Sequence, residues 1–232
     1  MVYTMYSREN LYKSAIKAIE KVYNESKWNK DVDFFRISDI INSINDNQLA
    51  SKEWIVEKIL PYLKKTDKIF IMGSWYGVLG HMLSQYTEND IIMYDVDPMS
   101  KEIGRYFCPT ETHPNCHFRV GDAIEYYMIH EVGRNHNIVI NTSVEHMEKE
   151  DIKLMSSFKD KDTLMVMQSN NYHEIDSHIN TYQNLEHFEM SLNLRNVLIS
   201  EKKKMSKYDR YFVVGKWKDL FLHYMMILKL SP

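Results

Sequence analysis

The chain has 232 residues, of which 44% are hydrophobic and 26% are charged. This is enough apolar surface for the core of one globular domain, and too much for a disordered chain. The formal charge of −3 excludes a global basic field that would hold nucleic acid by counterion release.

The compartment is indicated by what the sequence lacks. Its two cysteines are too few for a disulfide framework and fit a reducing environment. No apolar run reaches the roughly 18 residues of a membrane span. Residues 1–10 lack the basic-then-apolar order of a signal peptide. We therefore expect a cytoplasmic protein with no membrane partner.

The first part of the chain, residues 1–65, predicts a helical N-terminal cap. Apolar residues recur with helical spacing over residues 10–24, and a second short helix is expected at residues 37–44. Ser51 is predicted to be the N-cap of a third helix, which Pro61 should kink or shorten.

The remaining residues, 66–232, predict an α/β domain, because short apolar runs alternate with helix-length stretches, as in βα units with a parallel sheet. The predicted strands are residues 69–72, 91–94, 117–120, 138–141 and 164–168. Two later β-rich stretches, 188–199 and 208–215, have no room for a helix between them. They are expected to form an antiparallel pair at the edge of the sheet.

A glycine-rich turn follows the first predicted strand, in the order Gly73-Ser-Trp-Tyr-Gly77-Val-Leu-Gly80. Such a turn brings the backbone against a nucleotide-like ligand. Asp95, at the end of the second strand, lies about 20 residues further on, where a carboxylate can accept both ribose hydroxyls. Trp75 occupies the position at which a dinucleotide fingerprint needs glycine, so pyrophosphate binding is disfavoured.

These motifs resemble those of the class I S-adenosylmethionine-dependent methyltransferases. The resemblance spans residues 66–218 and rests on the glycine turn, Tyr-Asp-Val-Asp-Pro at 94–98, Val-Gly-Asp-Ala at 120–123, segment 137–147 and the final antiparallel pair. It implies a Rossmann-like seven-stranded sheet, mostly parallel with an antiparallel last strand, and S-adenosyl-L-methionine as cofactor.

The resemblance also implies cofactor contacts. The glycine turn would pack against the amino acid part of the cofactor, Asp95 would hold the ribose, and Asp122 would contact the adenine amino group. The residues with an implied cofactor role are Gly73, Ser74, Trp75, Gly77, Asp95, Val96, Asp122, Ala123 and Asn141.

Two positions depart from the family pattern. Ile71 stands where the family has an acidic residue, and Trp75 where it has a small one. Either Asn141 or the backbone at Gly73 must therefore contact the methionine amino group. Residues 141–144 do not form an Asp-Pro-Pro-Tyr-like tetrapeptide, the device that amino-methylating DNA enzymes use on a flipped base, so duplex DNA is disfavoured as a partner.

The acceptor is expected above the C-terminal ends of the fourth and fifth strands. Methyl transfer is an in-line displacement that needs a base only if the acceptor arrives protonated. The candidate catalytic bases are Glu145, His146 and His173, and each has an alternative interpretation as a surface or structural residue.

Four potential zinc ligands, Cys108, His113, Cys116 and His117, lie within ten residues. Zinc would need two pairs of these residues to converge on one tetrahedron. Because Cys116 and His117 are adjacent and should point to opposite sides of a strand, we expect no metal there or elsewhere.

The sequence thus predicts a methyltransferase that moves a methyl group from S-adenosylmethionine to nitrogen or oxygen on a small molecule or other substrate, with the cap helping to close the substrate site. One alternative is a catalytically lapsed S-adenosylmethionine-binding or scaffolding subunit of a larger complex. Another is an NAD-dependent oxidoreductase, which Trp75 disfavours. The acceptor, the oligomeric state and the need for a partner protein stay open.

Overall fold

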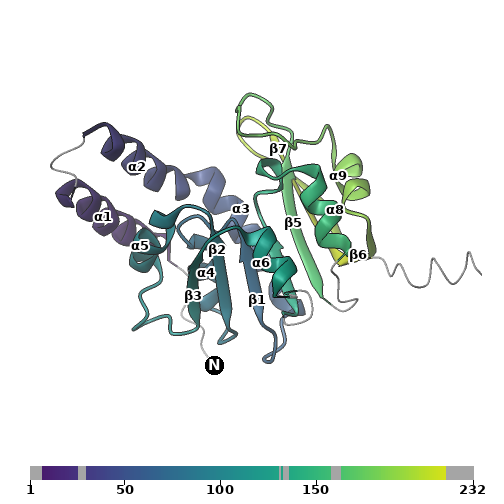
Figure 1. Ribbon diagram of the computed structural model, residues 1–232, viewed down its shortest axis with the longest axis horizontal. Coiled ribbons are helices and arrows are strands. Elements are labelled where there is room, and N and C mark those ends of the chain that lie inside the picture. The colour runs from purple at the N-terminus through teal and green to yellow at the C-terminus, as the bar shows by residue number, and fades with distance from the viewer. Residues whose placement is uncertain (1–6, 26–29, 131, 133–135, 158–162, 218–232) are drawn as a thin grey trace, which may run out of the picture. The chain divides into compact units, whose positions relative to one another are not determined.

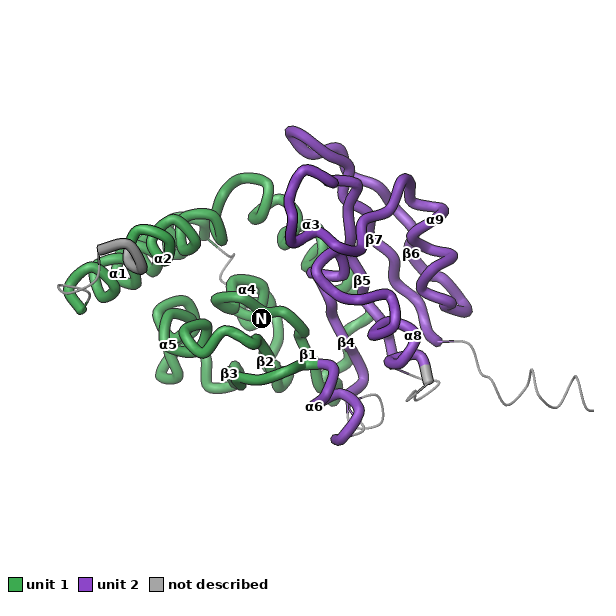
Figure 2. The backbone as a smooth tube through the Cα atoms, turned by 45° about the horizontal axis from the view of Figure 1, so that its top comes forward, with its two compact units in different colours: residues 1–123 green, residues 124–232 purple. Residues whose placement is uncertain are grey.

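The computed structural model describes residues 7–25, 30–130, 132, 136–157 and 163–217 (Figure 1). The chain divides into two compact units, one ending at Ala123 and the other beginning at Ile124 (Figure 2). Within the described ranges, no helix is both long and apolar enough to cross a membrane. The division into a cap of residues 1–65 and a domain of residues 66–232 stays a prediction.

The described strands form a seven-stranded sheet in the order β3-β2-β1-β4-β5-β7-β6. They are β1 (Ile69–Met72), β2 (Ile91–Asp95), β3 (Cys116–Val120), β4 (Ile138–Asn141), β5 (Leu164–Asn170), β6 (Leu194–Lys204) and β7 (Asp209–Trp217). This order, with β7 antiparallel to β5, confirms the predicted Rossmann-like sheet.

The helices alternate with the strands through most of the chain. They are α1 (Arg8–Glu25), α2 (Lys30–Ser43), α3 (Asp46–Ile59), α4 (Val78–Ser84), α5 (Pro98–Phe107), α6 (Ala123–Ile129), α8 (Lys149–Ser157) and α9 (Leu185–Leu192). Two short turns of 3-10 helix are η1 (Leu60–Tyr62) and η2 (Val144–His146).

In the first unit, β1, β2 and β3 pair in parallel, with Ile69 opposite Ile91 and Ile91 opposite Cys116. All four residues of β1 are buried, as expected for a strand covered on both faces. α1 buries one stripe, from Leu11 to Val22, and packs against α2 and α5. The N-terminal helices therefore belong to the same compact unit as the glycine turn.

Two glycines allow α4 to lie close to the sheet. A Cβ on Gly77 would come within 2.4 Å of the Phe118 ring, and one on Gly80 within 2.2 Å of the Met93 sulfur. Gly77 also has a positive φ of 71°, which favours glycine. Its lack of a side chain thus serves the packing of α4 on β2 and β3.

In the second unit, β4 and β5 run parallel, and β7 lies antiparallel between β5 and β6. All seven residues of β5 are buried, whereas burial alternates along β6 as in a strand with one exposed face. Asn170, at the end of β5, is paired with Arg210 of β7. This register places an arginine beside the C-terminal end of β5.

The prediction of an N-cap at Ser51 was wrong. α3 begins earlier, because the Asn45 side chain accepts a hydrogen bond from the Gln48 amide at 2.9 Å and so caps the helix. Ser51 is buried inside the helix. The predicted effect of Pro61 is confirmed, since α3 ends at Ile59 and Pro61 lies in η1.

The prediction of a β stretch over residues 188–199 was wrong in its first part. Residues 188–192 belong to α9, which the Asn184 side chain caps by accepting a hydrogen bond from the His187 amide at 2.8 Å. Asn193, at φ 50°, ends the helix, and the alternating burial of a strand starts only at Leu194.

Candidate functional site

The glycine turn after β1 is strongly curved. Gly73, Trp75 and Gly77 have positive φ values of 59°, 52° and 71°. Trp75 is unusual there, because a residue with a Cβ disfavours this conformation. The Ser74 amide donates to the Tyr94 carbonyl at 2.9 Å, which fixes the turn beside the end of β2.

Asp95 holds this turn through its carboxylate. One oxygen accepts a hydrogen bond from the Trp75 amide at 2.7 Å, and the other accepts from the Asp97 amide at 3.0 Å. Burial raises the pKa of Asp95, and these two amide bonds oppose that rise. A carboxylate offers about four acceptor positions, so about two remain for the hydroxyls of a ligand.

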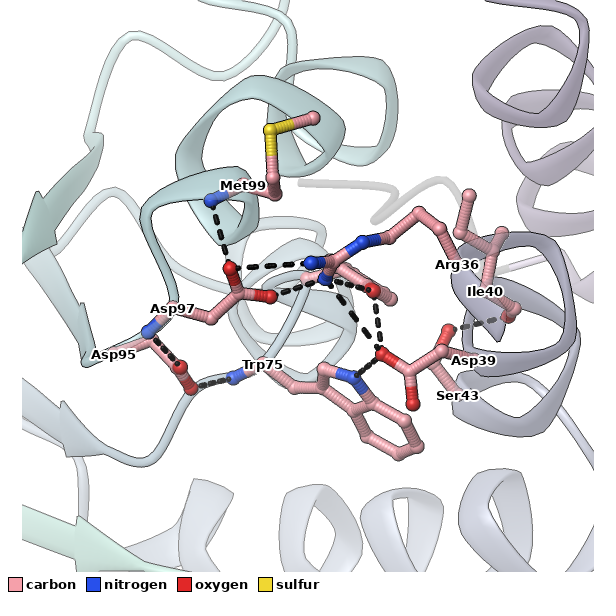
Figure 3. A network of polar contacts seen from close by, with 9 residues as sticks. Arg36, Asp39, Ile40, Ser43, Trp75, Asp95, Asp97 and Met99 are labelled. Atoms are coloured by element: carbon pink, nitrogen blue, oxygen red, sulfur yellow. Dashed lines mark hydrogen bonds and ion pairs between the residues drawn. The ribbon is translucent and has the colours of Figure 1, made fainter. Parts of the chain in front are cut away.

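Two residues of α2 reach the same turn, as Figure 3 shows. Asp39 Oδ2 accepts from the Trp75 indole nitrogen at 2.9 Å and from the Tyr76 hydroxyl at 2.5 Å. Arg36 donates to the Tyr76 hydroxyl at 3.0 Å and forms an ion pair with Asp97. The network therefore ties the N-terminal helical segment to the turn and to Asp97, the N-cap residue of α5.

The charges in this network stabilise one another. Burial alone would lower the pKa of Arg36, but its hydrogen bonds to Asp97 and Tyr76 outweigh that effect and raise it. Burial and the hydrogen bond to Asp39 raise the pKa of Tyr76. At neutral pH Arg36 is therefore charged and Tyr76 carries its proton.

The other predicted cofactor residues of the first unit lie around the strand ends. The Ser74 side chain is buried, and its hydroxyl has no hydrogen-bond partner among the described residues. Val96 follows Asp95 with 72% of its surface exposed. Asp122 is exposed and directly precedes α6, while Ala123 is buried.

Asn141 ends β4 in the second unit and is fully buried. Its side-chain oxygen accepts from the Ser143 amide at 2.9 Å, and its amide nitrogen contacts the Met147 sulfur at 2.9 Å. The side chain thus shapes the turn that leads into η2. Its contact with the methionine amino group of a cofactor stays a prediction.

Glu145 is buried at the C-terminal end of the second unit's parallel strands. Its Oε1 accepts from Arg210 Nη1 at 2.5 Å and from Asn170 Nδ2 at 2.8 Å. Arg210 is buried too, and it also donates to the Thr142 carbonyl. Arg210 was not among the predicted site residues, because it is the register of β7 on β5 that brings it there.

His146 and His178 lie beside Glu145, with their ring centroids 4.7 Å apart. Partial burial lowers the pKa of His146, although the residue reaches the surface. His173, by contrast, is exposed, and its Nδ1 meets the Thr181 hydroxyl at 2.5 Å, outside the cluster. Of the three candidate bases, the structure brings Glu145 and His146 together and adds His178 in place of His173.

The cysteine and histidine group at residues 108–117 does not converge on one point. Cys108 and Cys116 are both buried, and their side chains are hydrogen-bonded to each other. His113 contacts Gln85 at 2.8 Å, and His117 lies 3.8 Å from Asp90 at the surface. Within the described part of the chain, only Glu145, His146 and His178 gather three side chains suited to one metal ion.

Comparisons with known proteins agree with this architecture. No protein-family model and no curated protein matches the sequence. A mutant of MtNAS in complex with S-adenosylmethionine matches with a TM-score of 0.56 and 10% identity, over 90% of this chain and 73% of its own. The PH0226 protein from Pyrococcus horikoshii matches with a TM-score of 0.57 and 17% identity, over 75% and 93%.

A third match, a TehB-like S-adenosylmethionine-dependent methyltransferase from Corynebacterium glutamicum, has a TM-score of 0.50 and 14% identity, over 71% of this chain and 87% of its own. Together with the strand order and the antiparallel β7, these likenesses define the fold. It is that of the class I S-adenosylmethionine-dependent methyltransferases.

Proposed function

We propose that this protein binds S-adenosylmethionine and transfers its methyl group to nitrogen or oxygen on a small molecule. The observation that carries this proposal is the geometry of Asp95. Its carboxylate ends β2, is anchored by the Trp75 and Asp97 amides, and keeps acceptor positions for a ribose diol. The fold shared with the solved structures supports the same conclusion.

Three neighbouring features fit such a cofactor. The buried Ser74 hydroxyl lacks a partner among the described residues and can hydrogen-bond to a polar group of the ligand. The exposed Val96 offers an apolar surface to an adenine ring. Trp75 stands where a glycine would let a pyrophosphate approach the backbone, so a cofactor without phosphate is favoured over NAD.

The acceptor would be handled by residues of the second unit. Asn170, Arg210 and Glu145 form a buried polar group at the ends of β5 and β7. Such a group can position a small polar acceptor and exclude water, which supplies much of the rate of an in-line displacement. His146 has a lowered pKa, so it is neutral at pH 7 and is suited to remove a proton.

Calorimetric titration tests the cofactor first, with S-adenosylmethionine, S-adenosylhomocysteine and NAD as ligands. We expect the two sulfur ligands to bind and the Asp95→Ala variant to bind them at least about tenfold more weakly, because hydrogen bonds to a charged group contribute about 1.5–3 kcal/mol. Asp90→Ala is the control, since Asp90 is exposed and lies just before the first residue of β2, whereas Asp95 is its last residue.

The outcomes separate the alternatives. No binding of either sulfur ligand refutes the proposal, and binding of NAD instead indicates an oxidoreductase. If the sulfur ligands bind, labelled methyl transfer to candidate small amines, alcohols and phenols tests catalysis. Binding without transfer to any acceptor would favour the lapsed or scaffolding subunit, an alternative supported by Ile71, which is buried in β1 where the family has an acidic residue.

A further inference from the structure

Glu145, His146 and His178 form the cluster with the strongest unassigned chemistry. Each offers one atom able to hold a metal ion, and these atoms lie within 4.8 Å of one another. Glu145 and His146 come from η2, directly after β4, and His178 from the segment between β5 and α9. All three lie in the unit that begins at Ile124.

Both imidazoles are oriented by backbone carbonyls. His146 Nδ1 lies 3.0 Å from the Ser177 carbonyl oxygen, and His178 Nδ1 lies 2.7 Å from that of Tyr172. Because a carbonyl oxygen can only accept, each Nδ1 carries the proton and donates it. In the neutral imidazoles each Nε2 is then left with its lone pair, the arrangement typical of metal-ligating histidines.

The two oxygens of the Glu145 carboxylate have different surroundings. Its Oε1 is occupied by Arg210 and Asn170. Its Oε2 is buried and has no hydrogen-bond partner among the described residues. A buried carboxylate oxygen without a partner is costly. A cation held with the two imidazoles would satisfy it.

The segment that carries His178 is fixed to the strands. The Asn180 amide donates to the Glu145 carbonyl at 3.0 Å, and the Tyr182 amide donates to the Asn170 carbonyl at 3.0 Å. Tyr172 packs edge-on against His178, with ring centroids 6.0 Å apart. The cluster is therefore built into the fold rather than formed by a chance approach of exposed side chains.

We propose that Glu145, His146 and His178 bind a divalent transition-metal ion. Two imidazoles and one carboxylate are a ligand set used by zinc and by non-haem iron, with coordination positions left open. Arg210 already compensates the charge of Glu145, so affinity rests on the imidazoles and favours such an ion over magnesium. Zinc ligands stand about 3.4 Å apart in a tetrahedron, so the cluster closes slightly when the ion enters.

An open coordination position would give this ion a part in the proposed function. An oxygen or nitrogen of the acceptor bound there would be positioned and would release its proton to solvent more easily. The ion would then replace His146 as the group that promotes deprotonation, because the Nε2 lone pair of His146 is used in ligation. This role rests on the proposed methyl transfer. The proposal of metal binding does not rest on methyl transfer, because none of the three metal ligands lies in the unit that carries Asp95.

The test uses the full chain, stripped of metal with a chelator and titrated with Co²⁺ while its visible spectrum is followed. We expect one ion per chain and a spectrum of nitrogen and oxygen ligands, with Zn²⁺ displacing the cobalt. His178→Ala should weaken Zn²⁺ binding by about 100-fold or more, since even the outer partners of metal ligands account for about 10–100-fold.

His187→Ala is the matched control, because His187 is an exposed histidine of the same unit outside the cluster. It should bind both ions like the parent protein. Zn²⁺ should also raise the melting temperature of the parent. His178→Ala should keep a cooperative melting transition that Zn²⁺ does not shift, which shows that the variant is folded and has lost the site. Absence of stoichiometric binding, equal binding by His178→Ala, or a thiolate-to-cobalt band would each overturn the proposal.

Discussion

The contact between Asp39 and the Trp75 indole is expected to hold the glycine turn in its left-handed conformation. Asp39 Oδ2 accepts from the indole nitrogen at 2.9 Å and from the Tyr76 hydroxyl at 2.5 Å. The turn needs this support, because the φ of 52° at Trp75 costs about 1–2 kcal/mol in a residue with a Cβ.

The size of the contribution follows from the exposure of the carboxylate. A hydrogen bond to a charged group contributes about 1.5–3 kcal/mol. The Asp39 side chain is 41% exposed, so solvent screening reduces the value to about 1 kcal/mol. We therefore expect Asp39→Ala and Trp75→Phe, which keeps a ring but removes the N–H group, to show a coupling free energy of about 1 kcal/mol.

The assay is urea unfolding of the parent, both single variants and the double variant, followed by far-ultraviolet circular dichroism. In a control cycle, Asp90→Ala with Trp75→Phe should be additive within about 0.3–0.5 kcal/mol, because Asp90 precedes the opposite end of β2. If the coupling free energy between Asp39 and Trp75 also stays below about 0.3–0.5 kcal/mol, the idea that α2 stabilises the turn through this contact is refuted.

Three further predictions concern stability. Gly77→Ala should lower the free energy of unfolding by about 2–4 kcal/mol in a urea titration, because its Cβ would come within 2.4 Å of Phe118 and its φ is 71°; an unchanged midpoint would contradict the close packing. Burial lowers the pKa of His81 to about 4. The contribution of neutral His81 to the free energy of unfolding is therefore complete above pH 6.5 and is lost as the pH falls toward 4. Between pH 7 and pH 5 the free energy of unfolding should fall by about 2 kcal/mol more in the parent than in His81→Asn. Equal decreases in the two proteins would show that His81 does not cause the loss of stability. Glu145→Ala should cost about 3–5 kcal/mol because it leaves Arg210 buried without its partner, and combining it with Arg210→Met should recover part of that loss in the same titration.

The strands and the cofactor motif were predictable because their signals are local. The predicted strands at residues 69–72 and 138–141 coincide with β1 and β4, and β2, β3 and β5 differ from their predictions by one or two residues. Each is a short apolar run bounded by polar residues or turns. The position of Asp95 at the end of β2 was predictable for the same reason.

The helix at 185–192 was missed because two signals compete in one stretch. Phe188 and Leu192 are apolar and favour a strand by composition, but they lie on one buried face of α9. The capping residue Asn184 was the available signal, since its side chain closes the first turn. Tertiary packing on β6 and β7 then selects the helix.

The acceptor side of the site could not be predicted because it depends on long-range register. Nothing near Glu145 in the sequence indicates Arg210, which arrives through the pairing of β7 with β5. Nor does spacing distinguish His173 from His178, since both follow β5 in a segment without regular structure. The backbone hydrogen bonds of Asn180 and Tyr182, together with the bond from His178 Nδ1 to the Tyr172 carbonyl, place the His178 imidazole beside Glu145.

Because Asp95 and the three proposed metal ligands belong to separate units, binding of the two ligands can be tested separately. Asp95→Ala should lose affinity for S-adenosylhomocysteine and keep its affinity for Co²⁺, and His178→Ala should do the reverse. If Co²⁺ changes the affinity of the parent for S-adenosylhomocysteine, linkage requires S-adenosylhomocysteine to change the affinity for Co²⁺ by the same factor. A variant that loses both ligands together with its circular dichroism spectrum has lost its fold. One that loses both while folded would contradict the separate assignment of the two sites.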